Sequence, residues 1–551
     1  MKKNLKGVCK IHTPFYDLLD KGLLFLFVGL CLIFVLYPII CIVFQSITLD
    51  GSLSFEIYKN IIGENKGLLI NSILTALLSA GISTCLAATV ALFIYFLSPI
   101  LNKIGKFFLM VSMISPPFIA SLAYIQLFGR RGYVTYHLLG LNFDPYGMHG
   151  VIIMQVIGFI PLSGLMILAV IEKVDKRLLK ASLDLGSSKN SAVVNILIPM
   201  IKPGIAVAFL LSFVRSLSDF GTVTIIGGGF ETIATDIYME IIGYANFSKA
   251  AAMNILLLIP ALIIFIPYRR NMEKLNQRSK DNDSGDDDGF RIEVNSYPKI
   301  IISTISLVFF IIMLTQYICI FISAFSKFSK GEFMFTTEYI RYIGEHNIDS
   351  FIRSIIYAFI AGIVGSFVGI MISYYIERRK VFGYRSLDFI TTLPYILPGT
   401  FFGIAYILAF NSQPILLTGT AFIVVVNCIF KQIPLTTKTS SAVLSQLSVD
   451  IENASRDIGA SKFHVIKDII FPNMKGAFLV GFINNFTATM TTIGAIIFLI
   501  YPGKEVATVT LFDAINSGEY GVASMISVLI ILITLVVNVV FTMIILRKKV
   551  K

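Results

Sequence analysis

Long apolar stretches separated by short polar, basic segments recur along the whole chain. A helix needs roughly 20 apolar residues to cross the hydrocarbon core of a bilayer, and about twelve windows of the sequence meet this requirement. Because the stretches are continuously apolar and do not alternate, they predict membrane-spanning helices and not a β-barrel. The expected spans lie near residues 23–47, 68–97, 107–128, 150–171, 205–226 and 250–268 in the first half and near 300–325, 351–376, 387–410, 415–430, 477–500 and 522–546 in the second.

Two of these windows have features that interrupt a simple span. Lys431 and Pro434 directly follow the window at 415–430, and we expect them to end it. The prolines Pro116 and Pro398 interrupt the third span of each half at matching places. Broken helices often border a substrate path, and simple kinks at helix contacts are the alternative reading.

Composition agrees with a membrane protein. Hydrophobic residues make up 56% of the chain and charged residues 14%, against about 25% charged residues in soluble domains. The net charge of +12 does not indicate nucleic-acid binding, because the basic residues lie in short segments between the apolar runs, as the positive-inside rule requires. With the N-terminus inside, most of the 45 Lys and Arg fall in cytoplasmic segments. We therefore expect a multi-pass protein of the bacterial plasma (inner) membrane with both termini cytoplasmic.

The two halves of the chain carry one sequence repeat. KASLDLGSSKNSAVVNILIPMIK, which begins at Lys180, matches NASRDIGASKFHVIKDIIFPNMK, which begins at Asn453, and the register is 273 residues. Further upstream the register is 282, as for Ser72 and Ser354. The first half therefore carries about nine additional residues, which we expect in an external segment at 129–149. Because each half has an even number of spans, the copies should be parallel and related by an axis along the membrane normal.

The repeat and the composition give the expected domain organisation. It comprises a cytoplasmic N-terminal leader at 1–22, a first transmembrane module at 23–268 with a loop at 172–204, a cytoplasmic acidic linker at 269–299, and a second module at 300–551 with a loop at 431–475. The centre of the linker reads SKDNDSGDDDG, which is typical of a solvated tether. A calcium loop is excluded because no Glu closes a twelve-residue loop there.

The repeated segment itself has the pattern of a helix–turn–helix in a cytoplasmic loop. Residues 178–185 and 451–458 have a helical pattern, and Gly186 and Gly459 then permit a turn with positive φ. A second polar helix follows in each copy and runs to a proline. Any cytoplasmic loop can be amphipathic, but two copies in fixed register indicate a lever that docks on a cytoplasmic partner.

Both segments resemble the EAA loop of ABC importer permeases, whose pattern is E-A-A-x-x-x-G-x9-I-x-L-P. The residues that carry the resemblance are Lys180, Ala181, Ser182, Gly186 and Pro199 in the first copy and Asn453, Ala454, Ser455, Gly459 and Pro472 in the second. Lys180 and Asn453 stand where the family has Glu, although Glu452 is adjacent in the second copy. The resemblance implies that these loops couple the chain to an ATPase, and it leaves open which polar contacts fasten it.

The resemblance extends over nearly the whole chain. The stretch from SPPFIASLAY to the DFG-x6-GG pattern at 219–228 is similar to the fused permeases of the ferric iron importer family, which are related to 2-aminoethylphosphonate and thiamine permeases. This implies about 12 transmembrane helices in two parallel six-helix modules of the MetI-like type. It also implies a translocation path for a small solute, with ferric iron the first candidate and 2-aminoethylphosphonate, thiamine or a polyamine the alternatives. A secondary carrier is the competing class.

The expected partners follow from what the sequence lacks. No G-x-x-x-x-G-K-[ST] loop occurs in it, so the chain has no phosphate cradle for ATP. The resemblance implies two copies of a cytoplasmic ABC ATPase, which bind and hydrolyse ATP, and an extracytoplasmic solute-binding protein. We expect the chain itself to have no enzymatic activity, no cofactor, no metal site and no nucleic-acid partner.

Arg215 and Asp219 are the charges expected inside a span. They are four residues apart, which predicts a shared helical face, and charges at membrane depth usually mark a pathway. They either stabilise the bundle as a pair or line the path together with Pro116 and Pro398.

Overall fold

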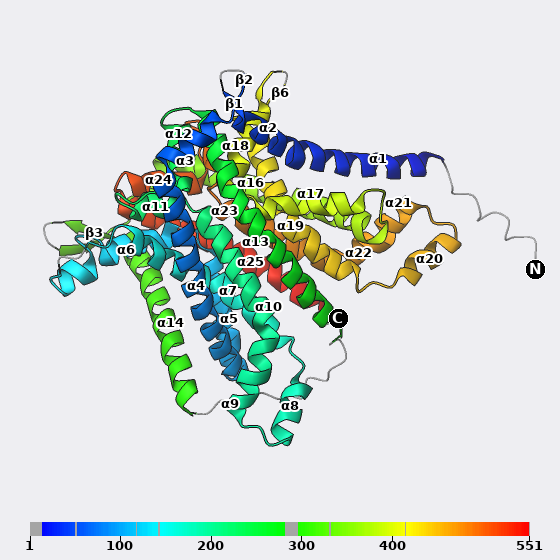
Figure 1. The fold of residues 1–551 in the computed structure, drawn as a ribbon, viewed down its shortest axis with the longest axis horizontal. Helices are drawn as coiled ribbons and strands as arrows, with labels where there is room; N and C mark the ends of the chain where they lie inside the picture. The colour runs from blue at the N-terminus through cyan, green and yellow to red at the C-terminus, as the bar shows by residue number, and fades with distance from the viewer. Residues whose placement is uncertain are drawn as a thin grey trace, which may run out of the picture. The chain divides into compact units, whose positions relative to one another are not determined.

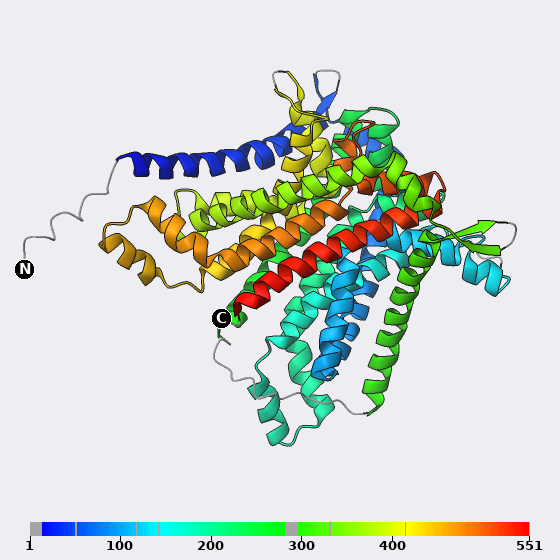
Figure 2. The same ribbon diagram turned by 180° about the vertical axis from the view of Figure 1, so that it is seen from behind.

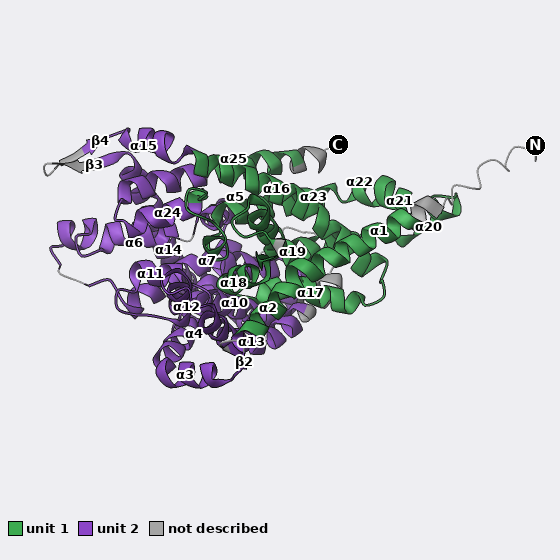
Figure 3. Cartoon of the chain, turned by 90° about the horizontal axis from the view of Figure 1, so that it is seen from above, with its two compact units in different colours: residues 1–45, 349–507, 533–551 green, residues 46–348, 508–532 purple. Residues whose placement is uncertain are grey.

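The computed structural model describes residues 14–49, 52–116, 118–141, 144–281, 296–329, 332–413 and 415–549. The chain divides into two compact units (Figure 3). Unit 1 comprises residues 1–45, 349–507 and 533–551, and unit 2 comprises residues 46–348 and 508–532.

Within the described residues, nine helices are long and apolar enough to cross a membrane. They lie at Leu18–Ser46, Lys66–Phe96, Met148–Glu172, Lys189–Leu217, Phe247–Met272, Ser296–Ala324, Ile348–Arg378, Ala421–Leu444 and Tyr520–Ile544. Two further helix pairs are sharply bent at a short break, and counting each pair as one span gives up to eleven. The twelfth expected span corresponds to a helix of only 17 residues, Lys475–Thr491. The all-α class is confirmed. The third span of each half is broken, and the fifth span of each half ends earlier than expected, at Leu217 and Thr491.

Unit 2 is built around helices that lie side by side (Figure 1): α4, α7 and α10 pack together, and α14 lies beside α4 and α6 in both views (Figure 2). Its core contains Ile94, Leu109, Ile167 and Leu197, all buried. The elements of unit 2 are β1 Thr48–Leu49, β2 Ser52–Leu53, α3 Glu56–Glu64, α4 Lys66–Phe96, α5 Pro99–Ile114, α6 Phe118–Phe128, η2 Tyr133–Leu138, α7 Met148–Glu172, α8 Lys176–Asp184, α9 Lys189–Ala192, η3 Val193–Leu197, α10 Ile198–Leu217, α11 Gly221–Ile226, α12 Ile233–Ile242, α13 Phe247–Asp281, α14 Ser296–Ala324, β3 Ser326–Ser329, β4 Glu332–Phe335, α15 Glu338–His346, nearly all of α24 Ala507–Asn516, and the first part of α25 Tyr520–Lys549.

Unit 1 pairs α19 with α23 and with α17, and it also includes the N-terminal helix α1. Its elements are α1 Pro14–Cys31, η1 Leu32–Leu36, α2 Tyr37–Ser46, α16 Ile348–Ser373, η4 Tyr374–Arg378, α17 Tyr384–Ile396, α18 Gly399–Phe410, β5 Asn411–Ser412, β6 Ile415–Leu416, α19 Ala421–Leu444, α20 Val449–Asp457, α21 Lys462–His464, η5 Val465–Ile470, α22 Phe471–Asn473, α23 Lys475–Thr491, η6 Ile496–Phe498, and the last part of α25. The strands form three small antiparallel hairpins, β1–β2, β3–β4 and β5–β6.

The compact units do not follow the two sequence halves. Helix α1 and the adjoining η1 and α2 belong to the first half of the sequence but to unit 1, whose remaining helices come from the second half. Asp20 on α1 fixes this placement, because its Oδ1 lies 2.5 Å from Nη1 of Arg379 and the carboxylate is buried. Helix α14, conversely, belongs to the second half and packs in unit 2. The first helix of each sequence repeat therefore belongs to the compact unit that is formed mainly by the other repeat. We call this arrangement the exchange of the first helices.

Two expectations about individual spans are wrong. The span at 415–430 does not end at Lys431, because α19 continues through Lys431 and Pro434 to Leu444. The Lys431 side chain donates a hydrogen bond to the carbonyl of Leu397 within the span. The Thr437 hydroxyl donates to the Ile433 carbonyl beside the proline.

The span expected at 205–226 is also interrupted. Helix α10 ends at Leu217 and the chain turns before α11 begins at Gly221. The centre of the acidic linker, residues 282–295, lies outside the described residues, and its flanks are helical in α13 and α14.

Candidate functional site

The loop after α7 forms the helix–turn–helix that the sequence predicts. Gly186 follows α8 with a φ of +90°, and its N–H donates to the Leu183 carbonyl at 2.9 Å. The Ser187 N–H donates to the Ser182 carbonyl at 3.0 Å. This pair of bonds satisfies the last carbonyls of the helix and requires a left-handed residue at the glycine position. The Ser188 hydroxyl then accepts a bond from the Ser191 N–H and caps α9.

The loop after α19 has the same geometry. Gly459 has a φ of +99°, and its N–H donates to the Arg456 carbonyl at 2.9 Å, while the Ala460 N–H donates to the Ser455 carbonyl at 3.0 Å. Ser461 caps α21 through the His464 N–H. The predicted positive-φ turns at both glycines are therefore confirmed. We call residues 173–197 and 445–470 the first and second coupling loops.

The other positions of the repeated motif occupy matching places. The carbonyls of Ala181 and Ala454 accept bonds from the N–H groups of Leu185 and Ile458. Pro199 and Pro472 lie at matching places, each in the α-helical segment that directly continues a π-helical segment, α10 after η3 and α22 after η5. The Lys180 side chain is half-buried and that of Asn453 exposed, so the two positions where the family has Glu differ in environment.

Each coupling loop presents one exposed apolar stripe. Leu178, Ala181 and Leu185 in the first loop are spaced i, i+3, i+7 and share a helical face, and all are exposed. The matching residues of the second loop are Ile451, Ala454 and Ile458, also exposed. Leu185 is 88% and Ile458 78% exposed. We call these two sets the docking stripes; sequence reasoning missed them, although the repeat register aligns them.

The buried faces of the two loops are held differently. Leu179 on α8 is fully buried in the apolar core with Leu197. Its repeat counterpart is Glu452 on α20, whose Oε1 lies 3.3 Å from Nε of Arg378 in a buried ion pair. An Nη atom of Arg378 also donates to the carbonyls of Leu444 and Leu447. An apolar contact thus anchors the first loop and a buried charge pair the second.

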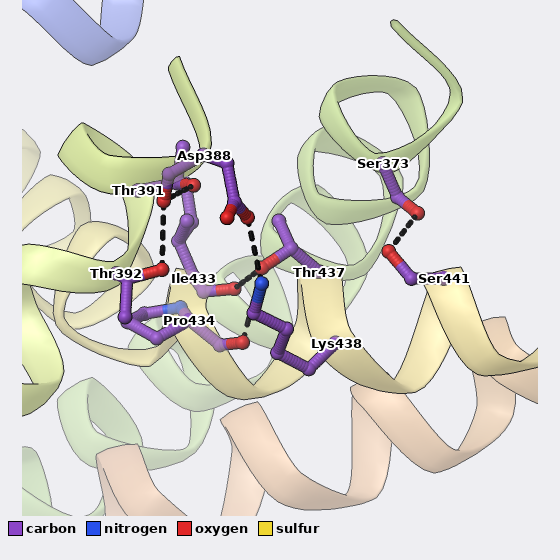
Figure 4. Close-up of polar contacts among 9 residues, drawn as sticks. All are labelled: Ser373, Asp388, Thr391, Thr392, Ile433, Pro434, Thr437, Lys438 and Ser441. Carbon is purple, nitrogen blue, oxygen red and sulfur yellow. Dashed lines mark hydrogen bonds and ion pairs between the residues drawn. The ribbon is translucent and has the colours of Figure 1, made fainter. Parts of the chain in front are cut away.

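In each repeat an ion pair joins the third and fourth helices near the coupling loop, and the third helix carries the lysine in the first repeat and the carboxylate in the second. In the first repeat, Nζ of Lys106 on α5 lies 2.5 Å from Oε1 of Glu172, the last residue of α7. In the second, Nζ of Lys438 on α19 lies 2.6 Å from Oδ1 of Asp388 on α17, the position that matches Lys106 (Figure 4). The Ser373 and Ser441 hydroxyls, 2.9 Å apart, tie the same segment of α19 to α16.

We predict that reversing one charge of the Lys438–Asp388 ion pair weakens the fold and that exchanging both restores it. Lys438→Asp places two carboxylates together and should lower the thermal midpoint of the purified protein. Lys438→Asp with Asp388→Lys should recover most of that loss. The pair is partly exposed, so the coupling free energy in a double-mutant cycle should stay at or below about 1 kcal/mol. A coupling free energy of zero would contradict the pairing.

Polar contacts between the fourth and fifth helices also repeat. The Ser163 and Ser212 hydroxyls are 3.0 Å apart between α7 and α10. At the matching positions Nδ2 of Asn485 lies 3.4 Å from Oγ1 of Thr436 between α23 and α19. Buried polar groups at membrane depth need such partners, and the repeat therefore extends to individual contacts inside the helices.

The third span of each repeat is broken at the predicted prolines. Helices α17 and α18 meet at Pro398 with a bend of 115°, and α5 and α6 are also sharply bent at the break that contains Pro116. The turn after the fifth helix packs against each break through a glycine. A Cβ at Gly221 would lie 2.1 Å from Cε1 of Phe118, and a Cβ on Gly399 would lie 3.3 Å from the Gly494 backbone. A side chain at Gly221 would therefore displace Phe118, and one at Gly399 would be in tight contact with the Gly494 backbone.

Asp219 and Arg215 do not share a helical face, because α10 ends at Leu217. The Asp219 carboxylate accepts bonds from Nε2 of Gln155 at 3.1 Å and from the Thr222 N–H at 3.0 Å, and it thus caps the start of α11. The Ser216 hydroxyl donates to Oε1 of Gln155. Arg215 is exposed. Sequence reasoning therefore found the residues of this turn but not their arrangement.

The segment at 129–149 carries its own charge pair. Nη2 of Arg130 lies 3.3 Å from Oδ2 of Asp144, and the guanidinium lies over the Tyr146 ring at 5.6 Å. The hydrogen bond from the Tyr146 backbone N–H, and then Arg130, hold the pKa of Asp144 below its ordinary value. Over the described residues, no three or more His, Cys, Asp or Glu side chains gather as a metal site.

The fold and the paired loops define a polytopic membrane transport protein built from two copies of one module. Residues 83–278 and 363–547 each match the family of binding-protein-dependent transport system inner membrane components. These two matches cover most of the chain, and it belongs to this family, the permeases of ABC importers.

Several relatives are similar over long stretches. The ferric transport system permease protein FbpB of Actinobacillus pleuropneumoniae is 30% identical over 526 residues, which are 91% of this chain and 75% of the relative. A putative ferric transport system permease of Haemophilus influenzae is 31% identical over 486 residues, 85% of this chain and 76% of the relative. A putative 2-aminoethylphosphonate permease, PhnU of Salmonella typhi, is 23% identical over 259 residues, 44% of this chain and 88% of the relative.

Proposed function

We propose that this chain forms the translocation path of an ATP-driven importer and that its docking stripes seat two copies of a separate ATPase. The observation that carries the proposal is the equal geometry of the two coupling loops, each with a glycine-capped helix and an exposed apolar stripe. Apolar side chains exposed at matching positions are expected where a partner covers them. The polar residues around the stripes differ between the loops, so an identical partner would recognise the stripes themselves.

Ferric iron is the cargo that we propose. The two relatives that align along most of the chain carry ferric transport in their names, whereas the phosphonate relative aligns over less than half of it. An extracytoplasmic solute-binding protein would deliver the cargo, and the partner ATPase would bind ATP, so that the chain itself needs no cofactor. In this arrangement the chain lies in the bacterial inner membrane with both coupling loops and both termini in the cytoplasm.

Reconstitution tests this function. The chain would be co-expressed with a partner ABC ATPase and an iron-binding solute-binding protein, and the complex purified into proteoliposomes. Uptake of ⁵⁵Fe that requires both ATP and the iron-loaded binding protein is the expected result. Uptake that persists without ATP, or a chain that never retains an ATPase, would contradict the importer class. ATP-dependent uptake of 2-aminoethylphosphonate in place of iron would contradict only the cargo.

Substitution of the two turn glycines should uncouple the complex. Gly186→Val and Gly459→Val force a β-branched residue into a positive φ, which costs of order 1–3 kcal/mol at each site. No atom lies within 4 Å of a Cβ at Gly186, so backbone strain and not a clash would distort the loop. The double variant should retain its thermal midpoint within a few degrees but lose most of the ATPase in co-purification. Gly229→Val, at an open glycine without positive φ, is the control; unchanged ATPase recovery in the double variant would reject the loop assignment.

A further inference from the structure

Lys431 is a charged side chain in the middle of a membrane-spanning helix. It lies ten residues into α19, about 15 Å along the axis at 1.5 Å per residue and therefore near half the thickness of a bilayer core. Its ammonium donates to the carbonyl of Leu397 at 2.6 Å and lies 5.6 Å from the centre of the Phe402 ring. A charge at this depth usually marks a substrate pathway. Its position in the first repeat is Gly158, so the feature is specific to the second.

The bond to Leu397 places Lys431 at the break between α17 and α18. Leu397 is the last carbonyl before Pro398, so the ammonium occupies the negative end of α17. Helix α18 begins at Gly399, directly after the break, and its first turn carries the partial positive charge of a helix N-terminus. One of the three ammonium donors is used by Leu397. The groups at the break that remain available to a ligand, two ammonium donors and the first turn of α18, therefore favour a negatively charged group.

One helical turn before Lys431 lies a second hydrogen-bond donor, and this one has no acceptor. Asn427 is four residues before Lys431 on α19 and shares its face, and it is 1% exposed. Its Nδ2 has no hydrogen-bond partner, although a buried amide without a partner costs about 1–3 kcal/mol. Lys431 and Asn427 thus present two donors on one face of α19. The α17 half of the break carries one carboxylate, Asp388, which is paired with Lys438, and α18, α19 and α23 supply none.

We propose that the α17–α18 break is an oxyanion-accepting site, in which Lys431 and Asn427 hold a small oxyanion during transport. Half-helix N-termini at broken spans are suited to anionic groups, and an approaching anion also favours the charged form of the ammonium. The oxyanion is either the ligand that accompanies ferric iron or a free cargo of the phosphonate kind. This inference rests on the proposed import function and specifies the chemistry of what passes.

Proteoliposomes that hold the complete complex test the site with two isotopes. The probe is ferric iron presented as its phosphate complex, labelled with ⁵⁵Fe and ³²P, and uptake is normalised to the complex recovered by co-purification of the ATPase. Lys431→Gln, which keeps a donor for Leu397 but removes the charge, should lower ³²P uptake at least tenfold, whereas Lys431→Arg should stay within about threefold of the parent. Lys103→Met, at an exposed lysine of α5, is the matched control and should transport normally.

The outcomes separate this inference from the proposed function. Coupled loss of both isotopes in Lys431→Gln indicates that the oxyanion travels with the metal. Uptake of ¹⁴C-labelled 2-aminoethylphosphonate in the absence of iron, dependent on Lys431, supports the site and rejects iron as the cargo. Uptake of ⁵⁵Fe without ³²P, or equal uptake by the Gln and Arg variants, overturns the oxyanion site and leaves the importer intact. A lower yield of Lys431→Gln with normal uptake per complex assigns Lys431 to capping Leu397 alone and also overturns it.

Discussion

Leu185→Asp combined with Ile458→Asp should abolish recovery of the ATPase with this chain. Both side chains stand at the exposed ends of the docking stripes, and a carboxylate there would be buried without a counter-ion when the partner binds, at a cost of several kcal/mol. A loss of at least tenfold in co-purified ATPase, equivalent to about 1.4 kcal/mol, is the expected result. Each single variant should retain part of the binding, because the other stripe remains.

The control for this prediction is an equally exposed leucine outside the loops. Leu138 in η2 is 75% exposed, and Leu138→Asp should leave ATPase recovery unchanged. The thermal midpoint of the double variant should also remain close to that of the parent, since neither side chain is packed. Full ATPase recovery with the double variant would mean that the partner binds elsewhere.

Arg378→Met should destabilise unit 1 by up to about 3–5 kcal/mol, because it removes the nearer counter-charge of the buried Glu452 carboxylate and leaves only Arg456, whose Nη2 lies 4.0 Å from the carboxylate. The Arg378 and Glu452 side chains are only 10% and 6% exposed, so water does not replace the lost partner. The second coupling loop would detach from η4, and ATPase recovery would fall together with the thermal midpoint. Thermal unfolding in detergent and co-purification measure the two effects.

The first repeat supplies the rescue for this variant. Since Leu179 stands where the second repeat has Glu452, Arg378→Met with Glu452→Leu converts the anchor into the apolar type. This double variant should regain at least half of the lost stability. Recovery will be incomplete because the carbonyls of Leu444 and Leu447 lose their donor. A double variant no better than Arg378→Met would show that the loss comes from those carbonyls and not from the buried charge.

Local features of the fold were predictable because each has a local cause. The turns of the coupling loops have a positive φ that favours glycine, and the prolines remove N–H groups within a span. In both cases the residue type alone indicates the local backbone geometry. The prediction that the span at 415–430 ends at Lys431 was wrong because it also rested on local residue types: a charge close to a proline usually marks the end of a span. The helix continues, and Lys431 finds its hydrogen-bond acceptor at the carbonyl of Leu397, which is distant in sequence.

Features that depend on partners in space were not predictable. The helical spacing of Arg215 and Asp219 assumed an unbroken helix, and no residue type announces that α10 ends at Leu217. The Arg378–Glu452 pair joins positions 74 residues apart. The register of the repeat aligns α1 with α14 as equivalent helices but does not say which other helices each one packs against.

The exchange of these first helices has a consequence for how the protein is made. Helix α1 leaves the ribosome early, but the rest of unit 1 begins only at residue 349, some 300 residues later. At about 5–20 residues per second, that interval lasts roughly 15–60 s, and Arg379, the ion-pair partner of Asp20, is made only after it. A chain cut in the linker yields two pieces, neither of which holds all the helices of either unit. Because the two permease halves are fused into one polypeptide, each copy of α1 is made together with one copy of the later helices of unit 1 and stays tethered to them. Synthesis as a single chain therefore favours the exchange of the first helices.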